Sequence, residues 1–138
     1  MSPRFVPASV AELAQIGLLA ELPGQTIRQL AGQMRREEVS PGQGVILEGE
    51  EGDRFYVILS GLFAVSNQGA LGPRRVLRPG EYFGEVALAM DVPRTASVTA
   101  LTPSTVASCD RATFDELVRP LFADDPGPSP HSSSPTEP

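Results

Sequence analysis

Two opposite charges, Glu85 and Arg94, bracket a short apolar run in the stretch GEYFGEVALAMDVPRTASVTA, residues 80–100. Arg94 follows Pro93, whose ring fixes the backbone and limits where the guanidinium can lie. A guanidinium is a planar fork that can donate to two phosphate oxygens, and a short helix starting after Gly84 would add backbone N–H groups. The stretch therefore predicts a small anionic ligand, with Arg94 as its phosphate contact.

Glu85 indicates that this ligand carries more than a phosphate. A carboxylate beside a phosphate is repulsive unless it meets a hydrogen-bond donor, and a sugar hydroxyl is such a donor. The sequence has no lysine cluster, no Walker-type glycine-lysine loop and no metal-binding group of carboxylates. These features indicate a phosphate of low charge, and a cyclic nucleoside monophosphate combines a single negative charge with a ribose hydroxyl.

The N-terminal part of the sequence has patterns that are typical of helices. Ser9 and Glu12 have the S-x-x-E spacing of a capping box, which predicts a helix start at this point. The pattern breaks in IGLLAELPG, and a second helix is then predicted by apolar residues at helical spacing, which are Ile27, Leu30, Ala31 and Met34. We expect both helices to pack against a neighbouring core.

The centre of the chain, residues 35–110, has a sequence pattern that is typical of β-strands. Short β-branched and aromatic runs, VILE, RFYVILS, LFAVS and ASVTA, alternate with glycine-containing turns, and the residues before Cys109 also read as a strand. Evenly spaced short strands indicate an antiparallel sandwich, barrel or jelly roll, because each crossover of a parallel sheet would need a helical segment.

A C-terminal helix is predicted in RATFDELVRPLF, with Asp110 as its N-cap and Pro120 as the residue that bends or ends it. The following ADDPGPSPHSSSPTEP is rich in proline and serine and has almost nothing to bury, so we expect it to be disordered. The predicted organisation is an N-terminal extension at residues 1–8, one domain at residues 9–122 and a disordered tail at residues 123–138.

Composition argues against several classes of function. The 138 residues carry 17 acidic and 11 basic side chains, a formal net charge of -6, so neither nucleic acid nor direct membrane contact is expected. The single histidine, His131, lies in the predicted tail, which argues against a metalloenzyme of the cupin type. Cys109 is the sole cysteine, and no run resembles a signal peptide or reaches transmembrane length, so a cytoplasmic location is expected.

The residues that predict the ligand also resemble a known family. FGEVALAMDVPRTASV resembles the phosphate-binding cassette of cyclic nucleotide-binding domains, which regulate catabolite activator proteins, cyclic-nucleotide-dependent kinases and cyclic-nucleotide-gated channels. The resemblance extends over GVILEGEEGDRFYVILSG and DRATFDELV and covers roughly residues 10–120. It implies a mainly β fold with flanking helices: an eight-stranded antiparallel jelly roll (β-roll) with N-terminal helices and a short C-terminal helix.

The resemblance also implies roles for individual residues. Glu85 would bind the ribose 2′-hydroxyl and Arg94 the cyclic phosphate, while Gly84, Ala87 and Thr95 would add backbone or hydroxyl contacts. The predicted ligand-binding set is Gly84, Glu85, Val86, Ala87, Arg94, Thr95 and Ala96. An apolar side of the pocket would be lined by Val45, Leu47, Val57 and Val76. No catalytic residue, metal or further cofactor is implied, so an enzyme is not expected.

Two questions about the ligand stay open at this point. Thr95 is either an ordinary strand residue or a hydroxyl that selects guanine, and since relatives that respond to cyclic AMP can also carry it, cyclic AMP is only slightly favoured over cyclic GMP. Glu85 and Arg94 are alternatively an internal ion pair in a domain that has lost its ligand. The chain would then be a ligand-free β-roll protein-interaction module.

The predicted output is a movement of the C-terminal helix on ligand binding. The signal would pass to an effector protein or to a parent polypeptide, for which a membrane channel or transporter is one expectation. Many relatives have a long final helix that closes over the base, whereas this helical run is expected to stop near Phe122. We therefore expect a lid that is short, supplied by a partner or absent.

Overall fold

The computed structural model describes residues 7–66 and 75–123, and this part of the chain holds eight strands. The strands are β1 (Arg35–Val39), β2 (Gly44–Ile46), β3 (Arg54–Ser60), β4 (Phe63–Ser66), β5 (Arg75–Leu77), β6 (Tyr82–Phe83), β7 (Ser97–Ala100) and β8 (Ser104–Asp110). The tail expected at residues 123–138 lies outside the described residues from residue 124 on, and so does the extension up to residue 6.

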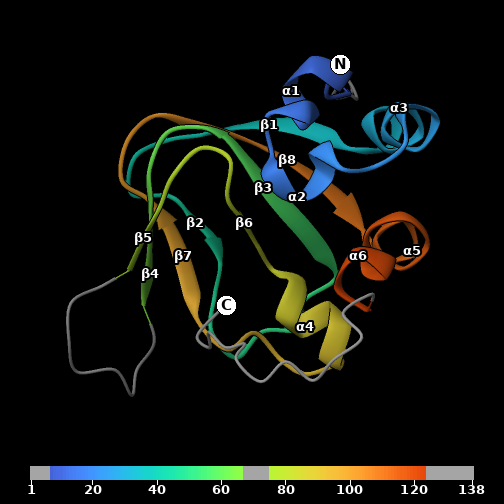
Figure 1. Ribbon diagram of the computed structural model, residues 1–138. Coiled ribbons are helices and arrows are strands. Elements are labelled where there is room, and N and C mark those ends of the chain that lie inside the picture. Colours follow the sequence, from blue (N-terminus) through green and yellow to red (C-terminus); the bar gives the residue numbers. More distant parts are fainter. Residues whose placement is uncertain (1–6, 67–74, 124–138) are drawn as a thin grey trace, which may run out of the picture.

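The strands form two four-stranded antiparallel sheets, with the orders β1-β8-β3-β6 and β2-β7-β4-β5. The two sheets face each other and enclose the interior of a roll (Figure 1). The expected fold, a mainly antiparallel β-roll with flanking helices, is confirmed.

Helices cover one side of the roll. They are α1 (Val10–Ala14), α2 (Gly17–Ala20), α3 (Gly24–Gln33), α4 (Glu85–Met90), α5 (Arg111–Thr113), the π-helical η1 (Phe114–Val118) and α6 (Arg119–Ala123). Figure 1 shows α1, α2 and α3 beside the sheet that contains β1, β3 and β8, with α5 and α6 next to them. α4 follows β6 in the chain, and Figure 1 places it below α6.

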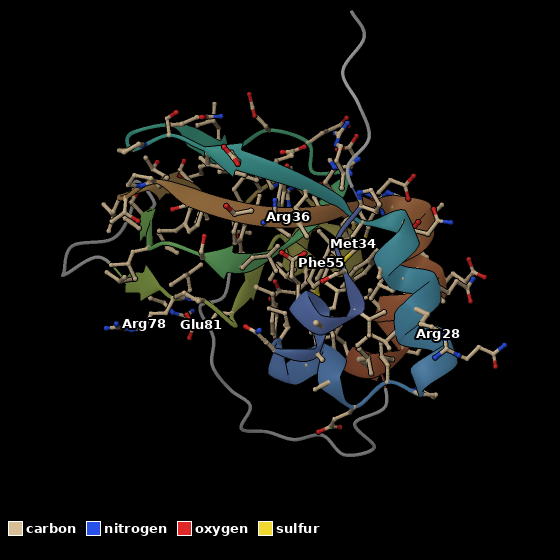
Figure 2. All side chains as sticks on the ribbon, turned by 90° about the horizontal axis from the view of Figure 1, so that it is seen from above. Arg28, Met34, Arg36, Phe55, Arg78 and Glu81 are labelled. Atoms are coloured by element: carbon tan, nitrogen blue, oxygen red, sulfur yellow. The ribbon has the colours of Figure 1, made fainter. Side chains whose placement is uncertain are left out.

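The side chains of β3 alternate between two hydrophobic cores. Phe55 and Val57 belong to the cluster shared with the helices, whereas Tyr56 and Ile58 belong to the cluster inside the roll. Successive side chains of a strand point to opposite faces, so one buried strand serves both cores. Figure 2 shows Phe55 in the interior beside Met34, which follows α3.

The N-terminal helix start is confirmed in detail. The Ser9 backbone N–H donates to Glu12 Oε1 over 3.0 Å, and the Glu12 N–H donates to Ser9 Oγ over 3.1 Å. Arg36 Nε on β1 donates to Glu12 Oε2 over 3.0 Å, so the same carboxylate ties α1 to the sheet. The segment IGLLAELPG, where the pattern breaks, contains the short additional helix α2, whose Leu19 is fully buried.

The chain after β8 forms a continuous helical run that includes a π turn. Asp110 Oδ1 accepts a hydrogen bond from the Thr113 N–H over 2.9 Å, which confirms the predicted N-cap. Pro120 does not end the helix, because the π-helical η1 directly precedes α6, with the Arg119 N–H bonded to the Phe114 carbonyl. The wider turn gives the proline ring room that a regular α-helical turn denies.

Cys109 on β8 has no exposed surface, and burial raises the pKa of its thiol to about 12. The thiol therefore stays protonated at neutral pH and packs as a small apolar side chain, as its sequence context predicts.

Candidate functional site

Gly84, directly before the first helix of the predicted ligand segment, has a backbone conformation that other residues adopt only with strain. Gly84 links β6 to α4 and has a φ of 94°, in the left-handed region. A Cβ at this position would lie 2.9 Å from the Arg54 carbonyl oxygen and 3.1 Å from Arg94 Nη1. Gly84 thus allows the backbone to approach the guanidinium, and the predicted helix start at Glu85 is confirmed.

Arg94 is buried, with 6% of its surface exposed, and backbone groups determine its position. Its Nη1 donates to the Gly84 carbonyl and its Nη2 to the Arg54 carbonyl, both over 3.0 Å. Its own backbone pairs with the turn before β3, since the Arg94 N–H donates to the Glu50 carbonyl over 2.8 Å and the Gly49 N–H donates to the Arg94 carbonyl over 2.9 Å.

Gly52 lies directly against this guanidinium. A Cβ at Gly52 would stand 2.5 Å from both Cζ and Nε of Arg94, closer than any real contact. The carbonyl of Gly52 accepts a hydrogen bond from Arg111 Nη2 over 3.3 Å. Sequence reasoning did not single out Gly52 or Arg111 for the site, because the contacts that bring them there join residues far apart in the chain.

Burial has the largest effect on the pKa of Arg94. It lowers the pKa of the guanidinium, and the nearby phenol of Tyr56 together with surrounding carboxylates acts in the opposite direction. Burial also raises the pKa of Tyr56, whose ring stacks on Phe83 with a centroid distance of 4.9 Å and an interplanar angle of 10°. A buried cation loses hydration, so an anion that contacts it regains part of that free energy.

Glu85 is the first residue of α4 and is also buried, with 8% of its surface exposed. A carboxylate in the first turn of a helix is stabilised by the unsatisfied N–H groups and the positive end of the helix dipole. Glu85 is one of the carboxylates whose charge raises the pKa of Arg94. The structure therefore brings the two charges of the predicted site together in one buried region.

The remaining predicted residues differ in their burial. Ala87 and Ala96 are buried, Val86 is half-buried and Thr95 is exposed. Of the four residues expected to line an apolar pocket, Leu47 and Val76 are exposed and Val45 packs at the edge of the core inside the roll. Val57 faces the helical side, because it alternates with Tyr56 and Ile58 along β3, so that expectation is wrong for Val57.

A cavity of about 400 Å³ lies beside Gly52 and is lined by Glu51, Gly52, Asp53, Asp91, Val92, Pro93 and Arg111. Three of these side chains are carboxylates and one is a cation, so this cavity does not suit an anionic ligand. Among residues 7–66 and 75–123 there is no group of three or more side chains suited to hold a metal ion. Within the same residues, no helix has the length and apolar character required to span a bilayer.

Residues 36–120 match the family model described as cyclic nucleotide-binding domain. The chain belongs to this family. A curated relative, the cAMP-dependent protein kinase regulatory subunit of Yarrowia lipolytica, is 40% identical over 110 residues, which cover 80% of this chain and 29% of the relative. The cyclic nucleotide-binding domain described here is accordingly a regulatory module and not a catalytic one.

Two solved structures share the fold of this domain. The regulatory domain of Toxoplasma gondii PKA, solved with cAMP, has a TM-score of 0.77 and 27% identity over 83% of this chain and 46% of that one. The regulatory subunit of a cAMP-independent protein kinase A from Trypanosoma cruzi, bound to guanosine, has a TM-score of 0.75 and 30% identity over 85% of this chain and 44% of that one. The present chain spans 24% to 29% of the length of the fungal regulatory subunits that it matches.

Proposed function

We propose that this cyclic nucleotide-binding domain senses cyclic AMP, with Arg94 as the phosphate ligand. The observation that carries the proposal is the buried guanidinium, which backbone carbonyls hold beside Gly84 at the start of α4. A guanidinium has five N–H donors, so donation to two carbonyls leaves donors for phosphate oxygens. The single charge of a cyclic phosphate matches Arg94, the one buried cation among residues 7–66 and 75–123.

Glu85 is the proposed contact for the ribose. Its carboxylate is buried within the same region as the guanidinium, where it can accept a hydrogen bond from the 2′-hydroxyl. The backbone of Gly84 and of the first turn of α4, through Val86 and Ala87, supplies further N–H groups toward the phosphate. Thr95 and Ala96 complete the proposed set directly after Arg94.

Adenine is the proposed base. The named fungal relative is a cAMP-dependent subunit, and the Toxoplasma gondii domain was solved with cAMP. Thr95 is exposed, which leaves its hydroxyl accessible to a guanine amino group, so cyclic GMP is the competing ligand to be measured.

A nucleoside without phosphate is a second candidate, because the Trypanosoma cruzi relative is bound to guanosine. A neutral nucleoside would leave the buried Arg94 charge without an anionic counterpart from the ligand. This cost favours the phosphorylated ligand for the present chain.

The proposed partner is a protein kinase catalytic subunit, in the cytoplasm. The support is the identity of the named relatives, which are regulatory subunits of such kinases. None of these named relatives is a channel or transporter, so a kinase subunit replaces that earlier expectation. The proposed output is a change in how the helical run after β8 packs on the roll.

Isothermal titration of the chain with cyclic AMP, cyclic GMP and guanosine tests the proposal. We expect the tightest binding for cyclic AMP and much weaker binding for guanosine. A ligand present at a thousand times its dissociation constant should also stabilise the fold by about 4 kcal/mol. Equal affinity for guanosine would refute the role of the phosphate, and no heat or thermal stabilisation with any of the three would instead indicate the ligand-free interaction module.

A further inference from the structure

The carboxyl end of α4 is completed by side chains from the helical run after β8. The N–H groups of both Asp91 and Val92 bond to the same carbonyl, that of Ala87. The next carbonyls, those of Leu88 and Ala89, accept hydrogen bonds from arginine side chains. The last carbonyls of a helix lack intrahelical partners, and arginines are suitable donors for them.

Arg119 makes the shorter of these contacts. Its Nη2 donates to the Leu88 carbonyl over 3.0 Å and its Nη1 to the Ala89 carbonyl over 3.3 Å. Arg111 Nη1 approaches the Leu88 carbonyl at 3.5 Å, at the limit of a hydrogen bond. Arg119 therefore makes the shortest polar contacts between the end of α4 and the C-terminal helical run, and Arg111 adds an ion pair with Asp91, the C-cap of α4, over 3.7 Å.

Three features orient the Arg119 side chain. Asp115 Oδ1 accepts hydrogen bonds from Arg119 Nε over 3.0 Å and from Nη2 over 2.8 Å. The guanidinium carbon lies 5.6 Å from the centre of the Phe114 ring, within range of a cation–π contact. Arg119 is also the first residue after the π turn, and its N–H closes that turn on the Phe114 carbonyl.

Apolar packing joins the same two segments. Leu88 is fully buried in the cluster that contains Phe114 and Val118 of η1. Leu88 thus shares a buried cluster with the helical run whose Arg119 donates to the Leu88 carbonyl. A polar bond of defined geometry is added to a hydrophobic contact, which specifies one position of the helix relative to α4.

We propose that Arg119 is a positioning residue that latches the C-terminal helical run onto α4 and thereby strengthens ligand binding at the opposite end of this helix. The inference rests on the proposed function, since Glu85 and the ligand lie at the amino end of α4. The helix has only six residues, so a displacement of one end moves the other. An anion at the amino end and a cation at the carboxyl end both match the helix dipole.

The test compares Arg119→Ala with Arg28→Ala. Arg28 is an exposed arginine of α3, and Figure 2 shows its side chain pointing away from the core, so it is a matched control for loss of charge. Affinity for cyclic AMP is measured by titration, and hydrogen exchange of residues 111–123 is measured with and without the nucleotide. Arg119→Lys is included because one ammonium replaces only part of the guanidinium contacts.

We expect Arg119→Ala to weaken cyclic AMP binding by about 5- to 30-fold, within the usual range of coupling between two sites. Residues 111–123 should exchange faster in this variant without ligand, and cyclic AMP should protect them less than in the wild type. The affinity and the exchange rates of Arg119→Lys should lie between those of Arg119→Ala and of the wild type. Arg28→Ala should match the wild type in both measurements.

Unchanged exchange at residues 111–123 in Arg119→Ala would overturn the latch, whatever the affinity. Affinity within twofold of that of Arg28→Ala would overturn the coupling to the ligand. If the wild type binds no cyclic nucleotide, the proposed function fails and with it the coupling, whereas the exchange without ligand still decides whether Arg119 holds the helix on α4.

Discussion

The two ends of α4 are both contacted by arginines, but the arginines come from different parts of the chain. At the amino end, Arg94 follows α4 in sequence and binds the Gly84 carbonyl, ten residues away. At the carboxyl end, Arg119 reaches back from α6 to the Leu88 carbonyl, across 31 residues. Arg94 is almost fully buried, whereas the side chain of Arg119 is 38% exposed.

This difference matches the two roles that we propose for the ends of this short helix. The buried cation at the amino end suits a ligand that compensates its lost hydration. The half-exposed cation at the carboxyl end makes hydrogen bonds that water can replace at modest cost, which suits a contact that forms and breaks. Three variants probe the amino end of α4 in order of decreasing effect, and a fourth is a reference remote from both ends; the carboxyl end is probed by Arg119→Ala.

Arg94→Ala should abolish most of the affinity at the amino end. Loss of a buried partner for the phosphate should cost about 2 to 5 kcal/mol of binding free energy, or on the order of 30-fold to several-thousand-fold in affinity. Titration with cyclic AMP measures the loss, with Arg28→Ala as the control for removal of one positive charge. A change of less than threefold would disprove the Arg94 assignment.

Glu85→Ala should separate the ribose contact from the phosphate contact. We expect affinity for cyclic AMP to fall by about 10- to 100-fold, because a hydrogen bond to a charged group is lost. Affinity for the 2′-deoxy analogue should change little, since this ligand lacks the hydroxyl. Equal losses for both nucleotides would show that Glu85 acts through the shape of α4 instead of through the ribose.

Gly52→Ala should displace Arg94 without removing its charge. The new methyl group would overlap the guanidinium, which is the flexible end of its side chain, so Arg94 should move before the fold does. We expect about tenfold weaker cyclic AMP binding with a small change in melting temperature. The control is Gly32→Ala on α3, where an added Cβ meets no atom within 4 Å. Equal binding by the two variants would contradict the packing of Gly52 on Arg94.

Glu12→Gln provides a reference for an ionic contact remote from both ends of α4. The bond from the Ser9 backbone and the contact with Arg36 lower the pKa of Glu12 below its ordinary value of 4.5. A lowered folded-state pKa stabilises the protein above the unfolded value, and this contribution is lost as the pH falls through the folded value. At neutral pH the variant should be less stable by about 0.5 to 1 kcal/mol.

The measurement for Glu12→Gln is chemical denaturation at several pH values, with Glu116→Gln as a control that removes one exposed carboxylate. The stability difference between wild type and Glu12→Gln should shrink as the pH falls below about 4.5. A difference that stays constant over this range would mean that the charge of Glu12 does not contribute. Cyclic AMP affinity should be unchanged in both variants.

Much of the fold follows from patterns that are local in the chain. The capping box of α1 joins residues three apart, and the N-cap at Asp110 also bonds three residues ahead, so both were predictable. Short β-branched and aromatic runs predicted β2, β3, β4, β7 and β8. The charged segment RREEV was not predicted as β1, because its five residues become a strand by pairing along β8 rather than by their own preference.

The candidate site was predicted in part. The segment that holds Gly84, Glu85 and Arg94 was recognisable because its residues stand close together in the sequence. Gly52 and the Arg54 carbonyl were not, since their contacts with Arg94 connect the start of β3 and the turn before it with the segment before β7. A glycine in a turn rich in carboxylates gives no sign that a guanidinium will lie against it.

Local sequence patterns are enough to predict two helix starts, the strands at the centre of the chain and the residue types for an anionic nucleotide, since these depend on near neighbours in the chain. Long-range packing is what turns Val57 toward the helices, places Gly52 against Arg94 and brings Arg119 to the carboxyl end of α4. The Arg119 contacts, for example, join residues 30 and 31 positions apart in the sequence. Their partners are selected by the closure of the roll and the packing of its helices, which no local pattern specifies.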